Sequence, residues 1–92
     1  MRDTTPTLVP EDVVREAADR FGLPLKRIRG SAYRSRRSVV ARRWVIRKLH
    51  EDGHSSPDIG AALLLDHTTI LYHLRVMERM AQEEAPPLGD SQ

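Results

Sequence analysis

The sequence predicts an all-α fold, a compact bundle of four to five helices that contains a helix-turn-helix. Apolar residues recur at helical spacing in several segments, whereas no alternating run or Asn-Gly hairpin signal marks a strand. A chain of 92 residues, 39% of them hydrophobic, has room for one core. We therefore expect one domain over residues 7–84. The ends, 1–6 and 85–92, are rich in Pro, Gly and polar residues and are expected to be disordered.

The first helix is expected to carry one apolar stripe and to end at Phe21. Apolar side chains from Val13 onward fall at i, i+1, i+4, i+5 and i+8, which places them on one face. Gly22 then provides a stop signal, and Pro24 prevents the helix from continuing. Residues 24–29 (PLKRIR) are expected to form one short helical turn.

A basic loop is expected at residues 30–37 (GSAYRSRR), followed by a helix from about Val39 to His50. The polar stretch EDGHS then ends this helix. Trp44 projects away from the apolar face of the helix, so it is expected to pack on another element. That apolar face consists of Ala41, Val45, Ile46 and Leu49.

A short helix with clear start signals is expected next. Ser56 is the expected N-cap, Pro57 occupies the first helical position, and Asp58 places an acid in the first turn. Gly60 lacks a side chain, which would allow another helix to approach closely.

The chain is expected to turn at Leu64-Leu65, after which Asp66 caps a long last helix over about residues 67–84. A short helix, a tight turn and a long helix form the layout of a helix-turn-helix. The expected buried stripe is Ile70, Leu71, Leu74, Met77 and Ala81, and the expected outer face is Thr68, Tyr72, Arg75 and Arg79.

The charges of the chain are strongly segregated. Residues 21–50 hold ten of the 15 basic residues and none of the 13 acidic ones. Such a zone favours a polyanion as partner, either nucleic acid or an anionic membrane surface. The segment RRSVVARRWVIRKL is basic and contains Trp, as interfacial helices do, but its apolar residues are scattered around the helix. Nucleic acid is therefore the expected partner, and no membrane is expected.

The tetrapeptide Asp66-His67-Thr68-Thr69 stands where a helix-turn-helix presents side chains to base edges in the major groove. Asp accepts a hydrogen bond from the cytosine amine, Thr can donate or accept, and His can do either. The alternative is that Asp66 only caps the helix and the threonines only fill its first turn. The basic loop and the cations between residues 42 and 48 would supply affinity that does not depend on sequence.

Enzymatic and metal-binding readings find little support in the sequence. His50, Asp52 and His54 lie close together, but no third ligand accompanies the two histidines at a useful spacing. Cysteine is absent, which fits a reducing cytoplasm. We expect no catalytic site, no metal, no cofactor and no small-molecule substrate.

Three stretches resemble the C-terminal DNA-binding domain (domain IV) of the bacterial replication initiator DnaA. They are RSRRSVVARR at 34–43, SPDIG at 56–60 and DHTTIL at 66–71, the last being the most specific. The resemblance runs from about Val13 to Met80, three quarters of the chain. Domain IV-like modules also resemble the helix-turn-helix of the Trp repressor.

The resemblance implies recognition of double-stranded DNA at a DnaA box, a short asymmetric site of the TTATNCACA kind. Asp66, His67, Thr68 and Thr69 would contact bases, and Arg34 would enter the minor groove, with Arg36 as a competitor for that role. Together with the basic zone and the outer face of the last helix, it gives these expected backbone contacts: Arg36, Arg37, Arg42, Arg43, Arg47, Lys48, Ser56, Pro57 and Tyr72.

The sequence departs from the family pattern in three places. Leu64-Leu65 replaces the usual Gly-Arg before DHTT, the Pro between the loop arginines is absent, and the chain has no G-x-x-x-x-G-K-[ST]. We therefore expect a free-standing reader of DNA that regulates replication or transcription in the bacterial or phage-infected cytoplasm, at the nucleoid. The alternative is a protein-interaction module of DnaA-like fold with lost or altered DNA specificity. An asymmetric box needs only a monomer, although the long last helix could pair with a second copy.

Overall fold

The computed structural model describes residues 7–30 and 34–84 of the chain. These residues form five helices and no strand, which confirms the predicted all-α class. The ends that were expected to be disordered (1–6 and 85–92) and residues 31–33 of the expected basic loop lie outside the described residues. The helices are α1 (Pro10–Phe21), α2 (Leu25–Ile28), α3 (Arg36–Glu51), α4 (Ser56–Leu63) and α5 (His67–Glu84).

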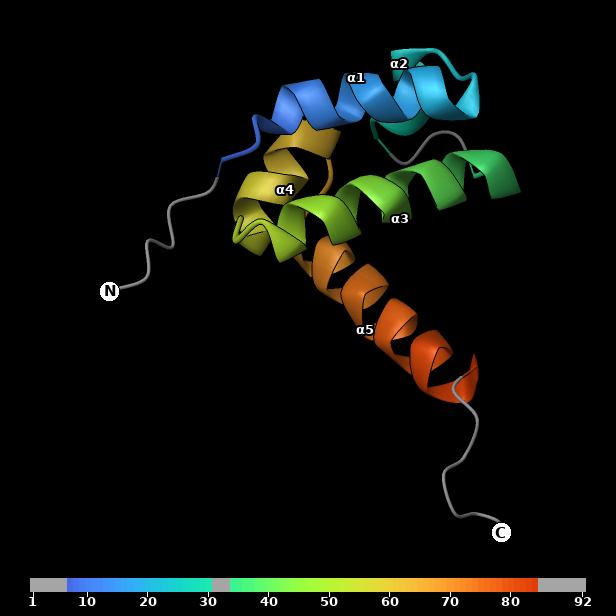
Figure 1. Ribbon diagram of the computed structural model, residues 1–92, viewed down its shortest axis with the longest axis vertical. Helices are drawn as coiled ribbons and strands as arrows, with labels where there is room; N and C mark the ends of the chain where they lie inside the picture. Colours follow the sequence, from blue (N-terminus) through green and yellow to red (C-terminus); the bar gives the residue numbers. More distant parts are fainter. Residues whose placement is uncertain (1–6, 31–33, 85–92) are drawn as a thin grey trace, which may run out of the picture.

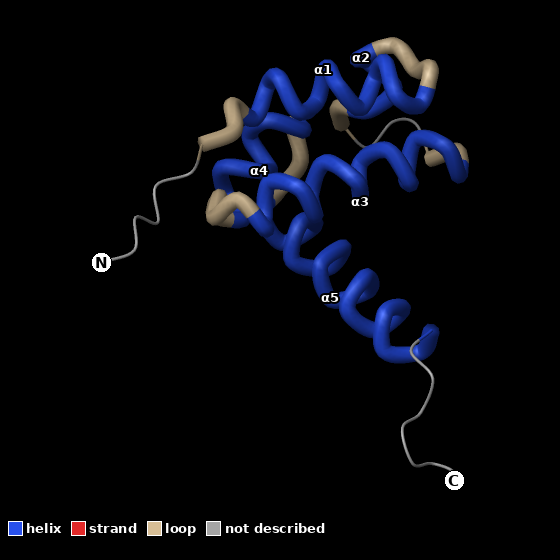
Figure 2. Tube along the Cα trace, viewed as in Figure 1, coloured by secondary structure: helices blue, strands red, loops and turns tan. Residues whose placement is uncertain are grey.

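Helices α1 to α4 and the first half of α5 enclose one apolar core. α1 packs along α3, and α5 leaves this body so that its C-terminal half points away from it (Figure 1). The connections between the helices are short (Figure 2). Burial of the apolar side chains in this core is the main source of stability for the bundle. The core consists of Val13, Val14, Ala17, Ile28, Ala41, Val45, Ile46, Leu49, Ile59, Leu63 and Ile70.

Helix α3 begins earlier than the sequence predicted, and helix α4 has a different N-cap. α3 begins at Arg36 because the Ser35 hydroxyl oxygen accepts a hydrogen bond from the Ser38 amide at 3.2 Å. The expected loop at 30–37 is therefore shorter. At α4 the cap is Ser55, whose hydroxyl oxygen accepts from the Asp58 amide at 3.3 Å. The expected N-cap, Ser56, is instead the first helical residue.

Trp44 packs on the C-terminal end of α1. Its ring lies edge-on to Phe21, with 6.2 Å between the ring centroids. The Arg20 guanidinium and the Lys48 ammonium lie 5.3 Å and 4.8 Å from the Trp44 ring centroid. This arrangement supplies the partner that helical periodicity alone left open.

The buried stripe of α5 differs from the predicted one. Ile70 is buried and Leu74 and Met77 pack against the core, but Leu71 is 45% exposed and Ala81 is exposed. Leu71 follows Ile70 by one position and so points away from the core, and Ala81 belongs to the C-terminal half of α5, which points away from the body (Figure 1). His73 takes a place on the buried side. The predicted outer face is confirmed as exposed: Thr68, Tyr72, Arg75 and Arg79.

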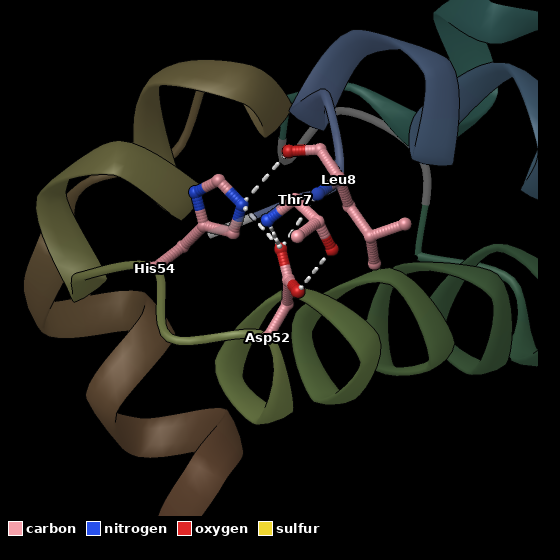
Figure 3. A network of polar contacts seen from close by, with 4 residues as sticks. All are labelled: Thr7, Leu8, Asp52 and His54. Atoms are coloured by element: carbon pink, nitrogen blue, oxygen red, sulfur yellow. Dashed lines mark hydrogen bonds and ion pairs between the residues drawn. The ribbon is translucent and has the colours of Figure 1, made fainter. Parts of the chain in front are cut away.

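A polar network fixes the segment before α1 to the loop after α3 (Figure 3). The Asp52 carboxylate accepts hydrogen bonds from the Thr7 amide at 3.0 Å and the Leu8 amide at 2.8 Å. It also accepts from the Thr7 hydroxyl, and His54 Nε2 lies 3.1 Å from both Asp52 Oδ2 and the Leu8 carbonyl oxygen. Since both neighbours of Nε2 are acceptors, that nitrogen carries the proton. The pair Asp52 and His54 is thus a structural clamp.

Candidate nucleic-acid interface

The connection between α4 and α5 consists of the three residues between Leu63 and His67. Leu64 adopts the left-handed conformation (φ 58°, ψ 41°), and the Leu65 amide donates to the Gly60 carbonyl at 2.8 Å. A Cβ on Gly60 would lie 2.5 Å from the Leu65 carbonyl oxygen. The absence of a side chain at Gly60 therefore leaves room for the backbone of the turn. The nearest neighbours of Gly60 thus belong to the turn before α5, whereas the sequence suggested another helix there.

The first turn of α5 presents the predicted tetrapeptide to solvent. Asp66, His67 and Thr68 are exposed, and Thr69 is half-buried. The Asp66 carboxylate accepts a hydrogen bond from the Thr68 hydroxyl, and its other oxygen lies 3.8 Å from His67 Nδ1. These contacts, the Thr68 hydroxyl first, lower the pKa of Asp66 below its ordinary value. Asp66 thus stays ionised next to the amides at the start of α5.

Contacts on the buried side of α5 anchor this first turn to the rest of the fold. Ile70 is fully buried, and its amide donates to the Asp66 carbonyl at 3.2 Å. One turn further, the Nε–H of Arg43 donates to Nδ1 of His73 at 3.1 Å, joining α3 to α5. Sequence reasoning missed this role of His73. Its spacing of three residues from Ile70, on the buried side of the helix, was the available signal.

The start of the basic loop is attached to the same turn. The Gly30 amide donates to the Leu63 carbonyl at 2.6 Å, three residues before Asp66. Gly30 has a φ of 78°, a conformation that favours glycine. At the other end of the loop Ser35 caps α3, and Arg34 is exposed. The hydrogen bond from Gly30 is a contact that no sequence pattern indicated.

Arg42 belongs to the scaffold of this loop. Its side chain is 3% exposed, and its Nε–H donates to the Ile28 carbonyl at 2.7 Å. A further bond to the Arg27 carbonyl measures 3.3 Å. Burial, followed by the charge of Arg34, lowers the pKa of Arg42. The predicted contact of Arg42 with the DNA backbone is disfavoured, because the side chain is buried and two of its donors face carbonyl groups inside the fold.

The other predicted DNA-contacting residues differ in how far their side chains already make contacts within the fold. Arg43 is half-buried against His73, and Lys48 lies 3.5 Å from Glu16 as well as over Trp44. Arg47 is exposed, with Glu51 at 3.6 Å. Arg34, Arg36 and Arg37 near the start of α3 face solvent, as does Pro57 at the start of α4. Tyr72 is exposed on the outer face of α5, and its ring lies edge-on to His73 with 5.6 Å between the ring centroids. Ser56 is half-buried beside Pro57.

Within residues 7–30 and 34–84, no three His, Asp or Glu side chains gather as they would around a metal ion. None of the helices there combines the length and apolar character that a membrane crossing requires.

No protein-family model, no curated protein and no solved structure matches this chain. The resemblance to domain IV of DnaA therefore remains a prediction that rests on the three sequence stretches.

Proposed function

We propose that this chain binds double-stranded DNA in a sequence-specific manner, with α4, the turn and α5 acting as a helix-turn-helix. The first turn of α5 would enter the major groove, where Asp66, His67, Thr68 and Thr69 would read base edges. The observation that carries the proposal is the hydrogen bond from Gly30 to Leu63. It attaches the basic loop directly before the exposed tetrapeptide, so the loop and the reading side chains would approach one DNA site together.

The start of α3 supports an anionic partner. Arg36 and Arg37 occupy its first turn, which contains no acidic residue. Positive side chains at a helix N-terminus oppose the helix dipole and destabilise the free protein. A phosphate at this position would relieve that repulsion and accept from the guanidinium groups. We assign backbone contacts to Arg36 and Arg37, with Arg47, Ser56, Pro57 and Tyr72 as further candidates, and minor-groove entry to Arg34.

The resemblance to DnaA domain IV suggests a DnaA box as the target and regulation of replication or transcription as the role, at the nucleoid. Leu65 stands at the position where that family carries an arginine, so one cationic DNA contact is replaced by an apolar side chain. The preferred sequence is therefore expected to differ from a standard box or to be bound more weakly.

One observation favours a second candidate function, a protein-interaction module. Leu64 is 68% exposed in a strained conformation directly before the reading helix. Exposed apolar side chains of this kind mark protein contacts when they gather in a patch. Salt dependence separates the two candidates, because phosphate contacts weaken steeply with salt and apolar contacts do not.

The test is fluorescence anisotropy of a labelled DnaA-box duplex and a scrambled duplex of equal length, each at two salt concentrations. We expect preference for the box, and weaker binding of both duplexes at the higher salt. Equal, salt-sensitive binding of the two duplexes would support DNA binding but would reject the DnaA box as the target. Absence of binding to either duplex would reject the proposal in favour of the interaction module.

A further inference from the structure

Arg42 is the one arginine or lysine that the fold buries among residues 7–30 and 34–84, with 3% of the residue exposed. A guanidinium keeps its charge at any ordinary pH, so its burial costs free energy unless its donors meet acceptors. An apolar side chain of similar size would often stabilise such a position equally well. The reason for an arginine here therefore lies in the contacts that its donors make.

The donors of Arg42 bind the last carbonyl groups of α2. Its Nε–H donates to the Ile28 carbonyl at 2.7 Å, and its Nη2 donates to the Arg27 carbonyl at 3.3 Å. Carbonyl groups at the end of a helix have no partner within the helix, so they are open to such donors. Because the two donors belong to one planar group, they fix the direction in which the chain leaves α2.

Two residues after Ile28 the chain is attached a second time. The Gly30 amide donates to the Leu63 carbonyl at 2.6 Å, at the end of α4. The start of the basic loop is thus held from two sides, by Arg42 on α3 and by the turn before α5.

The far end of the basic loop is held by the same helix as Arg42. Ser35 caps α3, and its hydroxyl donates to the Ser38 hydroxyl at 3.1 Å. Ser38 is fully buried one turn before Arg42. Arg34 directly precedes this cap and is exposed. The place from which Arg34 reaches toward DNA therefore depends on how α3 holds both ends of the loop.

We infer that Arg42 is a positioning residue for DNA recognition, which acts through the basic loop and does not contact DNA itself. It would set the path of the loop so that Arg34 enters the minor groove while the first turn of α5 lies in the major groove. The minor groove is only about 6 Å wide, so a small displacement of the loop would remove the contact. This inference rests on the proposed function.

The test isolates the minor-groove contact. Replacement of one adenine at a time by 2,6-diaminopurine adds an amino group to the minor-groove edge and leaves the major-groove edge of adenine unchanged. The ratio of Kd between the substituted and unsubstituted forms of the preferred duplex, measured by fluorescence anisotropy, is the minor-groove penalty. The full-length wild type should show a penalty of roughly tenfold at one or more adenines.

Two variants of Arg42 and one matched control are compared. Arg42→Lys keeps the charge but removes the planar pair of donors, and Arg42→Gln keeps one donor group without the charge. Arg43→Lys is the control, because Arg43 is the next residue of α3 and its Nε–H donates to His73 instead of the loop. Circular dichroism and urea unfolding establish that each variant is folded under the conditions of the binding assay.

Arg42→Lys should lose the minor-groove penalty, as Arg34→Ala does, and Arg43→Lys should keep it. Arg42→Lys should cost no further affinity when it is combined with Arg34→Ala, because the loop then has no arginine to position. Its loss should add to that of His67→Ala, which reads the other groove.

A folded Arg42→Lys variant that keeps the full penalty would overturn the inference. So would a salt slope that falls by about one when Arg42→Gln is added to Arg34→Ala, because this would indicate a direct phosphate contact. A wild type that prefers its duplex but shows no penalty at any adenine would overturn the inference and leave the proposed function standing. A wild type that binds no duplex would overturn both.

Discussion

Arg43 donates a hydrogen bond from Nε to Nδ1 of His73 at 3.1 Å, so the buried histidine acts as an acceptor. An imidazolium has no acceptor and would also face the charge of Arg43. Burial first, then the charges of Arg43 and Arg42, lower the pKa of His73 below its ordinary 6.5. Protonation of His73 is therefore coupled to loss of this hydrogen bond between α3 and α5.

This coupling predicts a loss of stability on acidification. Above the ordinary His pKa of 6.5, His73 is neutral in both the folded and the unfolded state. Its contribution to the free energy of unfolding is therefore fully present there. As the pH falls below that value the unfolded state takes up the proton first, so the free energy of unfolding falls until the folded pKa is reached. His73→Asn keeps an acceptor near the position of Nδ1 and removes the titration. Urea unfolding between pH 7 and pH 5 should show a smaller decline for this variant, and an equal decline would contradict the assignment.

The clamp around Asp52 predicts a second, more acidic transition. Hydrogen bonds from Leu8 first, then from Thr7, together with the charge of His54, lower the pKa of Asp52 below its ordinary 3.8. Its stabilisation is therefore complete above that value and is lost as the pH falls through the folded pKa. Asp52→Asn places an amide group among donors, so its melting temperature at neutral pH should be lower than that of the wild type. The difference should shrink below pH 3.8, and a difference that persists unchanged there would reject the clamp.

The close contact at Gly60 predicts that the turn does not tolerate a side chain on α4 at this position. Gly60→Ala gains up to about 1 kcal/mol of helix propensity. The Cβ would meet the Leu65 carbonyl oxygen at 2.5 Å, and overpacking costs roughly 1–3 kcal/mol or more. We expect a net loss of about 1–2 kcal/mol in urea unfolding. Ala61→Ser, at an exposed neighbour, is the control and should remain near the wild type.

The helices could be predicted from the sequence because each has a short-range cause. The stripe of α1, the stop at Gly22 and the face of α3 follow from spacing and from single residues, and all are confirmed. The cap of α4 was missed by one residue, since Ser55 and Ser56 are equally suitable by composition. Local signals thus locate the ends of the helices to within one helical turn.

The candidate site depends on contacts that local patterns do not contain. Arg42 belongs to a run of similar cations, and its burial depends on where the Ile28 carbonyl lies in space. The bond from Gly30 to Leu63 joins residues far apart in sequence. The exposure of Asp66, His67 and Thr68 followed from their position at a helix start, whereas the assignment of the cations required the tertiary structure.

His67 is exposed in the first turn of α5, which makes it the sharpest test of base reading. His67→Ala should cost roughly 1–3 kcal/mol of binding free energy on the preferred duplex and little on a random one. His50→Ala removes another exposed histidine, at the end of α3, and should bind like the wild type. Anisotropy titrations of both variants on both duplexes decide the matter. Equal losses on the two duplexes would remove His67 from the base contacts.

Arg36 offers a test in which stability and binding move in opposite directions. It is exposed in the first turn of α3, where a positive charge opposes the helix dipole. Arg36→Glu should therefore raise the free energy of unfolding of the free protein by about 0.3–1 kcal/mol. The same change should weaken binding to every duplex and reduce the slope of log affinity against log salt by about one. Arg79→Glu, in the C-terminal half of α5 that points away from the body, separates this effect from a general change in net charge. A variant that is more stable yet binds DNA with an unchanged salt slope would place Arg36 outside the interface and leave Arg37 as the phosphate contact at the start of α3.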